Sequence, residues 1–106
     1  MKSSSRILVK KTIDASKATT LKELIGEIYR AFDYEDYIPY ANIDGFEDLF
    51  GPDLYLDTDS IEIRIEGWVL LEKRLRGSGL ESLTVSIDLL SQRWKAAGKK
   101  FVVERA

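Results

Sequence analysis

Ser60-Ile61-Glu62-Ile63-Arg64-Ile65-Glu66 is the stretch that decides the fold, because isoleucine alternates with charged residues along it. Successive side chains of a β-strand point to opposite faces of a sheet, so this alternation predicts a strand with one apolar and one polar face. It is the clearest strand pattern in the chain. The elements predicted on either side of it define the rest of the fold.

Before this strand, the sequence predicts a first strand and then a helix. Residues 6–11, Arg-Ile-Leu-Val-Lys-Lys, form a short apolar run that suits a strand. Thr20 and Glu23 have the spacing of a capping box, in which the threonine hydroxyl accepts from the amide of Glu23 and the carboxylate reaches back to the amide of Thr20. The helix that starts there has one apolar stripe, formed by Leu21, Leu24, Ile25, Ile28 and Phe32.

A second, shorter helix is predicted between this helix and the strand. Residues 33–40 are expected to be a loop, because Pro39 lacks a backbone donor. Asn42 is a good N-cap for a helix that ends near Phe50. One face of this helix is apolar, with Ile43, Phe46, Leu49 and Phe50. The opposite face is acidic, with Asp44, Glu47 and Asp48.

After the strand, the sequence predicts two helices and a third strand. The apolar positions are Trp68, Leu71 and Leu75 in the first helix, and Leu83, Ile87, Leu90, Trp94 and Ala97 in the second. Both tryptophans are therefore expected in the core, and residues 101–103 close the chain as a strand. The predicted fold is α/β, a small three-stranded parallel sheet with helical crossovers in the order β-α-α-β-α-α-β. One domain is expected over residues 1–106, with residues 1–5 disordered.

The composition excludes many kinds of catalysis. The chain has no cysteine and no histidine, which removes thiolate nucleophiles, imidazole bases and the usual zinc ligands. We therefore expect no enzyme, no cofactor and no metal site. The sequence shows no apolar stretch of the roughly 20 residues that cross a membrane and no signal-peptide pattern, so a cytoplasmic protein without a membrane association is predicted.

Charge is distributed unevenly along the chain. Residues 33–62 contain ten of the 18 acidic residues and none of the 16 basic residues, which gives this segment a charge of −10 and the rest a charge of +8. Such asymmetry favours a charged partner. The acidic face of the second helix lies in the middle of this segment.

These residues resemble the barstar family of ribonuclease inhibitors. Thr20-Leu21-Lys22-Glu23-Leu24 looks like the helix entry of that family, and residues 42–50, Asn-Ile-Asp-Gly-Phe-Glu-Asp-Leu-Phe, resemble its signature Asn-Leu-Asp-x-Leu-x-Asp-x-Leu. The resemblance covers most of the chain and implies a barstar-like fold. It also implies that the second helix and the loop before it block the active site of a basic ribonuclease or toxin nuclease, with acids in place of substrate phosphates.

The resemblance identifies a set of candidate partner-binding residues: Asp44, Asp48, Glu47, Tyr40, Asn42 and Tyr37. We also expect a protein partner without direct nucleic-acid binding, and a monomer when free. Three positions depart from the family. Glu47 replaces a tryptophan between the two aspartates, Pro39-Tyr40-Ala41 replaces the usual Tyr-Gly before Asn42, and Arg93 stands where the prototype has an acidic contact. These departures predict that the chain has a partner of its own.

Other interpretations of the same residues remain open. The chain is alternatively an acidic adaptor that binds a basic protein other than a nuclease. Asp44 can serve only the dipole of its helix and Asp48 only the solvated surface, while the tyrosines can pack on their own domain. The alternative from another class is an enzyme that holds Mg²⁺ on Asp53, Asp57 and Asp59, but Asp57-Thr58-Asp59 lacks the spacing of a calcium loop.

Overall fold

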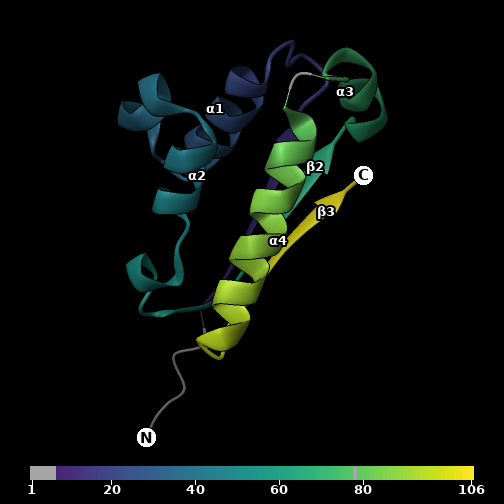
Figure 1. Cartoon of the computed structure of the whole chain (residues 1–106). Coiled ribbons are helices and arrows are strands. Elements are labelled where there is room, and N and C mark those ends of the chain that lie inside the picture. Colours follow the sequence, from purple (N-terminus) through teal and green to yellow (C-terminus); the bar gives the residue numbers. More distant parts are fainter. Residues whose placement is uncertain (1–6, 78) are drawn as a thin grey trace, which may run out of the picture.

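The computed structural model of the chain describes residues 7–77 and 79–106, so the disorder expected for residues 1–5 lies outside the described residues. The elements, in chain order, are β1 (Ile7–Asp14), α1 (Leu21–Ala31), the 3₁₀ helix η1 (Glu35–Tyr40), α2 (Ile43–Leu49), the 3₁₀ helix η2 (Pro52–Leu54), β2 (Thr58–Glu66), α3 (Trp68–Arg74), α4 (Leu80–Ala96) and β3 (Lys100–Arg105) (Figure 1). The protein is α/β, as the sequence predicts.

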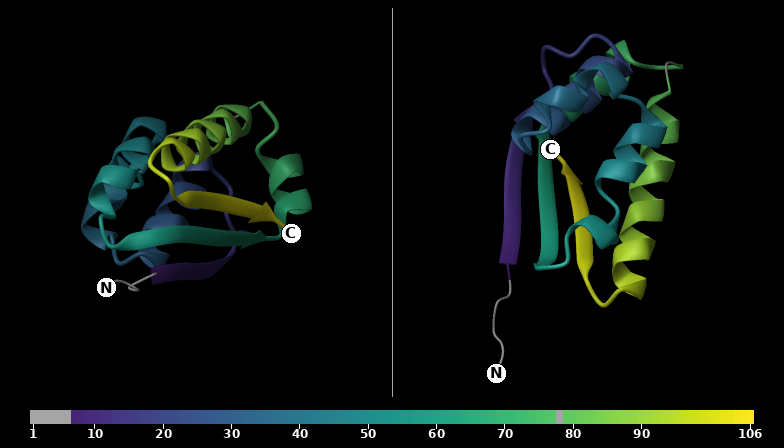
Figure 2. Two further views of the ribbon diagram at one scale, coloured as in Figure 1. Left: turned by 90° about the horizontal axis from the view of Figure 1, so that it is seen from below. Right: turned by 90° about the vertical axis from the view of Figure 1, so that its left-hand side faces the viewer.

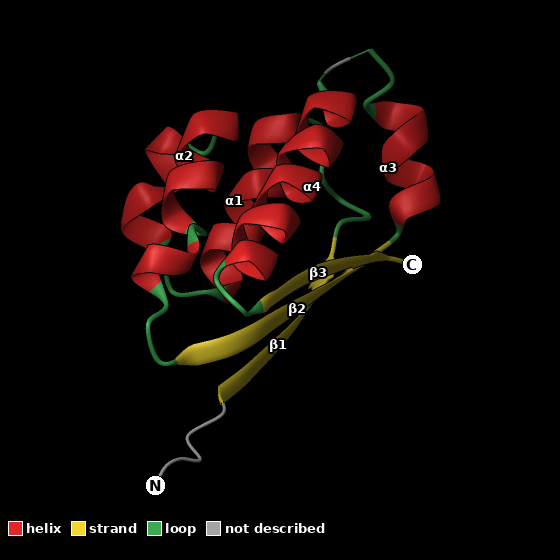
Figure 3. Ribbon diagram, turned by 60° about the horizontal axis from the view of Figure 1, so that its bottom comes forward, coloured by secondary structure: helices red, strands yellow, loops and turns green. Residues whose placement is uncertain are grey.

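The three strands form one parallel sheet in the order β1-β2-β3. Ile13 lies opposite Ile65, and Ile61 lies opposite Phe101. Each connection moves one strand further in the same direction, and right-handed crossovers of this kind place their helices on the same face. Figures 2 and 3 show the helices gathered on one face of the sheet.

The other face of the sheet is open and charged. Lys10 pairs with Glu62 at 3.7 Å, and Arg64 pairs with Glu66 at 3.2 Å and with Glu104 at 2.9 Å. The two carboxylates, that of Glu66 first, raise the pKa of the Arg64 guanidinium. Parallel strands covered on both faces are continuously apolar, whereas the alternation in β2 matches a sheet covered on one face.

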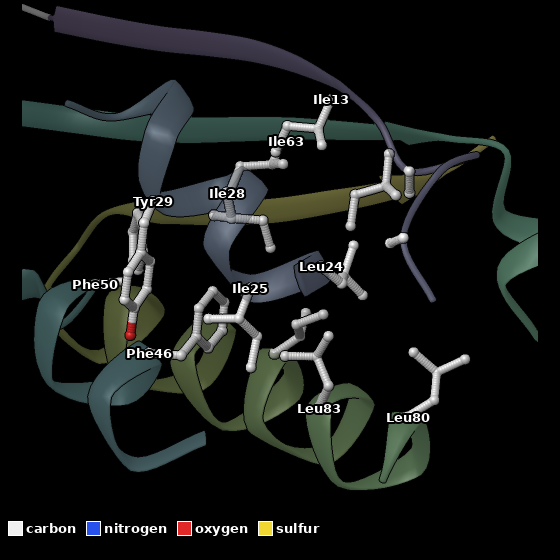
Figure 4. Packing of buried hydrophobic residues seen from close by; sticks show 14 of the residues in the cluster. Ile13, Leu24, Ile25, Ile28, Tyr29, Phe46, Phe50, Ile63, Leu80 and Leu83 are labelled. Carbon is white, nitrogen blue, oxygen red and sulfur yellow. The ribbon is translucent and has the colours of Figure 1, made fainter. Parts of the chain in front are cut away.

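The core lies between the sheet and the helices. Ile61, Ile63 and Ile65 of β2 are buried beneath the buried residues Leu24, Ile25 and Ile28 of α1 and Leu83, Leu90 and Trp94 of α4. Figure 4 shows part of this packing, with Tyr29 of α1 beside Phe46 and Phe50 of the α2 segment. Tyr29 is fully buried and was absent from the predicted stripe. The prediction that both tryptophans lie in the core is confirmed.

Two local predictions differ from the structure. Residues 33–40 are not a plain loop, because η1 covers most of them and includes Pro39. The fixed φ of proline suits a short 3₁₀ turn, which needs few hydrogen bonds. Thr20 caps Glu23 as predicted, at 3.1 Å, but the Glu23 carboxylate accepts from the amide and hydroxyl of Thr19, both at 2.7 Å. These bonds lower the pKa of Glu23.

In the part of the chain that the structure describes, no helix has the length and apolar character needed to cross a membrane.

Candidate functional site

The candidate site is built on α2, a helix of 7 residues with two different faces. The side chain of Asn42 accepts from the amide of Gly45 at 2.7 Å and so caps the helix. Phe46 and Phe50 are buried, whereas Asp44 and Asp48 are exposed. Residues four apart are neighbours on a helix surface, so the two carboxylates lie one turn apart on the outside. The predicted division of this helix is confirmed for these four residues.

Glu47 has a different position from the two aspartates. It is half-buried, and its carboxylate accepts a hydrogen bond of 2.6 Å from the hydroxyl of Ser86 in α4. Ser86 itself is 1% exposed. The structure therefore places Glu47 in the contact between α2 and α4, and leaves Asp44 and Asp48 as the exposed acids of this helix.

The end of α2 is also attached to α4. The indole Nε1 of Trp94 donates to the backbone carbonyl of Phe50 at 2.8 Å, in the buried interior. The ring of Phe50 packs edge-on against that of Phe32, with 4.9 Å between the ring centroids. The centroid of the Phe46 ring lies 5.1 Å from that of Phe50. The last carbonyl groups of a helix lack partners within the helix. Trp94 supplies one here and fixes the orientation of α2.

The segment before α2 is held by a hydrogen bond from the buried residue Tyr29 of α1. Its hydroxyl donates to the carbonyl of Tyr40 at 3.3 Å. A Cβ atom at Gly45 would lie 2.4 Å from the same carbonyl oxygen and 2.9 Å from the Tyr29 hydroxyl, so only glycine fits there. Burial, and secondly the charge of Asp48, raise the pKa of Tyr29 to about 12.

The three tyrosines of η1 and its N-cap divide between core and surface. Tyr34 is half-buried, and its hydroxyl shares a hydrogen bond of 2.6 Å with the hydroxyl of Tyr55. Tyr37 and Tyr40 are 48% and 66% exposed. Tyr37, Tyr40, Asn42, Asp44 and Asp48 are therefore the exposed candidates within residues 37–48, where they alternate with buried and half-buried residues, and Glu47 is half-buried.

The other candidate features give no site. Among residues 7–77 and 79–106, no group of three His, Cys, Asp or Glu residues is placed to hold a metal ion, which includes the predicted alternative at Asp53, Asp57 and Asp59. A cleft of about 720 Å³ lies between α1, η1 and the β1–α1 connection. Its charged side chains include Glu23, bound to Thr19, and the ion pair of Arg30 with Glu27 at 2.6 Å.

Sequence reasoning missed the residues that position α2. Ser86 carries a readable signal, because it is a polar residue among the buried positions Leu83, Ile87 and Leu90 of α4. Tyr29 carries one too, since it follows Ile25 by four residues on the same helix. Trp94 was predicted in the core, but its bond to Phe50 joins residues 44 positions apart and has no local pattern.

Comparison of the chain with protein-family models, with curated proteins and with solved structures gives no match. The geometry of α2 and its surroundings is therefore the basis on which a function is proposed.

Proposed function

We propose that this protein is a barstar-like inhibitor that binds a basic ribonuclease or nuclease toxin through Asp44 and Asp48. The observation that carries this proposal is the pair of exposed aspartates one turn apart on a helix whose other side is fastened to the core. The resemblance of residues 42–50 to the barstar signature supplies the class of partner.

The physics of such a contact favours carboxylates. A nuclease active site presents arginine and lysine side chains to the phosphates of its substrate, and carboxylates accept from the same donors in short charge-assisted hydrogen bonds. Two unit charges about 4 Å apart attract by roughly 4 kcal/mol at an effective dielectric near 20, before desolvation is subtracted. Asp44 and Asp48 together offer two such contacts at a spacing set by the helix.

The binding surface is preorganised, which supports tight binding. Ser86 and Trp94 hold α2 on α4, and Tyr29 holds the segment before it. A partner then does not have to order this surface, and the entropy lost on association is smaller. Tyr37 and Tyr40 add aromatic area with few rotatable bonds, which is typical of residues that contribute strongly to interfaces.

The test measures inhibition of catalysis as well as binding. The protein is used as bait at low salt with an extract of its source and with purified basic microbial ribonucleases, and the activity of each captured ribonuclease is measured with and without it. We expect stoichiometric inhibition. A tight complex with full ribonuclease activity would refute inhibition and favour the acidic adaptor.

Single substitutions test the residues. Asp48→Ala is expected to weaken inhibition by at least 30-fold, about 2 kcal/mol, and Asp44→Ala to weaken it as well. Thermal stability should be nearly unchanged, because both side chains are exposed. Asp88→Ala is the matched control, since Asp88 is an exposed acid of α4 outside this surface. Equal inhibition by Asp48→Ala and wild-type protein would exclude the proposed surface.

A further inference from the structure

The connection between α2 and β2 exposes two leucines. Leu54 is 61% exposed and Leu56 is 80% exposed, the largest exposure among the large apolar side chains of the described residues. They stand two positions apart, at the end of η2 and in the turn that leads into β2. Single exposed apolar residues are common, whereas exposed apolar groups that gather into a patch mark interaction surfaces, and two leucines this close in sequence are a candidate for such a patch.

Hydrogen bonds hold this segment in one conformation. The amide of Leu54 donates to the carbonyl of Gly51 at 3.2 Å, and the amide of Thr58 donates to the carbonyl of Tyr55 at 3.1 Å. Tyr55, which stands between the two leucines, is fixed on both sides. Its hydroxyl meets that of Tyr34 at 2.6 Å, its carbonyl accepts from Lys99 Nζ at 2.5 Å, and its ring lies 5.6 Å from that of Trp94. The leucines are therefore presented to solvent by a rigid support.

The leucines also lie within the acidic part of the surface. Asp53 and Asp57 flank them and are exposed, and residues 33–62 contain no lysine or arginine. In Figure 1, α2 and the chain that follows it toward β2 lie along the left-hand side of the molecule, and the right-hand view of Figure 2 faces that side. One approaching molecule can therefore meet α2 and this connection together.

We propose that Leu54 and Leu56 anchor the same basic protein partner that α2 binds, by entering an apolar depression that its lysines or arginines border. The proposal rests on the proposed function for the identity of the partner, but it names a separate part of the surface. The complementary charges of Asp53 and Asp57 select a basic border, and the rigid support means that little freedom is lost when the leucines are buried. We call Leu54 and Leu56 with their flanking aspartates the leucine surface.

Two cationic peptides of equal charge test this surface without a purified partner. One contains lysine and leucine, and the other has serine in place of every leucine. Each is titrated into ¹⁵N-labelled protein at low salt, and amide shifts are followed at residues 43–49 and 53–57. Both peptides are expected to shift 43–49. The leucine peptide is expected to shift 53–57 at least twice as far as the serine peptide at equal saturation, and it should bind about 10-fold more tightly.

Variants assign the preference to the two leucines. In Leu54→Ser with Leu56→Ser, the preference for the leucine peptide should fall to less than twofold. Val85→Ser is the control, because Val85 is a 67% exposed apolar residue on α4; it should keep the full preference. A preference that persists in the double variant, or amide shifts around Val85 in place of 53–57, would overturn the leucine surface.

The outcomes separate this proposal from the proposed function. Shifts at 43–49 without shifts at 53–57 would refute the leucine surface and leave the acidic helix intact. Shifts at 53–57 without shifts at 43–49 would refute the acidic helix and leave the leucine surface intact. Light scattering at protein concentrations between about 10 and 500 μM tests whether a second copy of this chain occupies the leucine surface instead. We expect a monomer, and a dimer that the double variant abolishes would overturn the proposal.

Discussion

Gly45 is the position where α2 approaches its neighbours most closely. Alanine is the better helix former by about 1 kcal/mol, but its Cβ would overlap the Tyr40 carbonyl at 2.4 Å. The overlap with backbone outweighs the helix preference, because neither α2 nor the segment before it can move without breaking its contacts. Gly45→Ala is therefore expected to lower the free energy of unfolding by about 1–3 kcal/mol, measured by urea denaturation.

Gly51→Ala is the control for this substitution. A Cβ at Gly51 would meet its nearest atom at 3.7 Å, and the residue has an extended backbone with φ −65°. Alanine fits there, so stability should stay the same or rise by a few tenths of a kcal/mol. If Gly45→Ala and Gly51→Ala had the same stability, the close packing beneath α2 would be disproved.

At the scale of elements, the hydrogen bond between Glu47 and Ser86 fastens α2 to α4. Ser86→Ala leaves a half-buried carboxylate without its donor, which is expected to cost about 1–3 kcal/mol of unfolding free energy in chemical denaturation. Ser82→Ala on the exposed side of the same helix should be neutral or slightly stabilising. Equal stability of these two variants would show that Glu47 is simply a surface acid.

Most helices and strands could be predicted from local patterns. The capping residues Thr20 and Asn42 accept hydrogen bonds from Glu23 and Gly45, and the alternation at residues 60–66 became the middle strand. These signals are local, so the sequence displays them. The failure came at η1, where Pro39 indicated a break and tertiary contacts, such as that of Tyr29 with Tyr40, support a 3₁₀ turn.

The candidate site was predicted in part. The exposure of Asp44 and Asp48 follows from the periodicity of α2 and agrees with the structure. Periodicity also placed Glu47 on the acidic face. Glu47 lies at the border of that face, however, and there its carboxylate accepts a hydrogen bond from Ser86 of α4. Leu54 and Leu56 carried no signal, because their exposure depends on how Tyr55 is held by Tyr34 and Lys99, both distant in sequence.

For the whole molecule, buried phenols predict a loss of stability at alkaline pH. Burial raises the pKa of Tyr29 to about 12, and burial with the Tyr34 hydrogen bond raises the pKa of Tyr55 as well. In the unfolded chain a tyrosine titrates near pH 10. A raised folded pKa contributes stability that is complete below about pH 10 and is lost as the pH rises toward 12. We therefore expect Tm to fall progressively above about pH 10.

Thermal unfolding at pH 8 to 11 checks this expectation, with Tyr29→Phe as the comparison. The difference in Tm between wild type and variant should change above about pH 10, because only the wild type has this phenol to ionise. Absorbance at 295 nm adds a second measurement, in which Asp48→Asn should lower the pKa of Tyr29 by removing a nearby negative charge. An identical pH dependence of wild type and Tyr29→Phe would contradict the burial of this hydroxyl.

The two edge strands of this open sheet have a consequence for how molecules of this protein meet each other in concentrated solution. Within the part of the chain that the structure describes, β1 and β3 each pair on one side only, so each leaves a row of backbone groups able to recruit a strand from another molecule. Lys10 and Lys11 in β1 and Lys100 and Arg105 in β3 place charge along these rows. Charged side chains on edge strands are a common protection against edge-to-edge pairing, so we expect replacement of these basic residues by threonine to increase aggregation in concentrated solution.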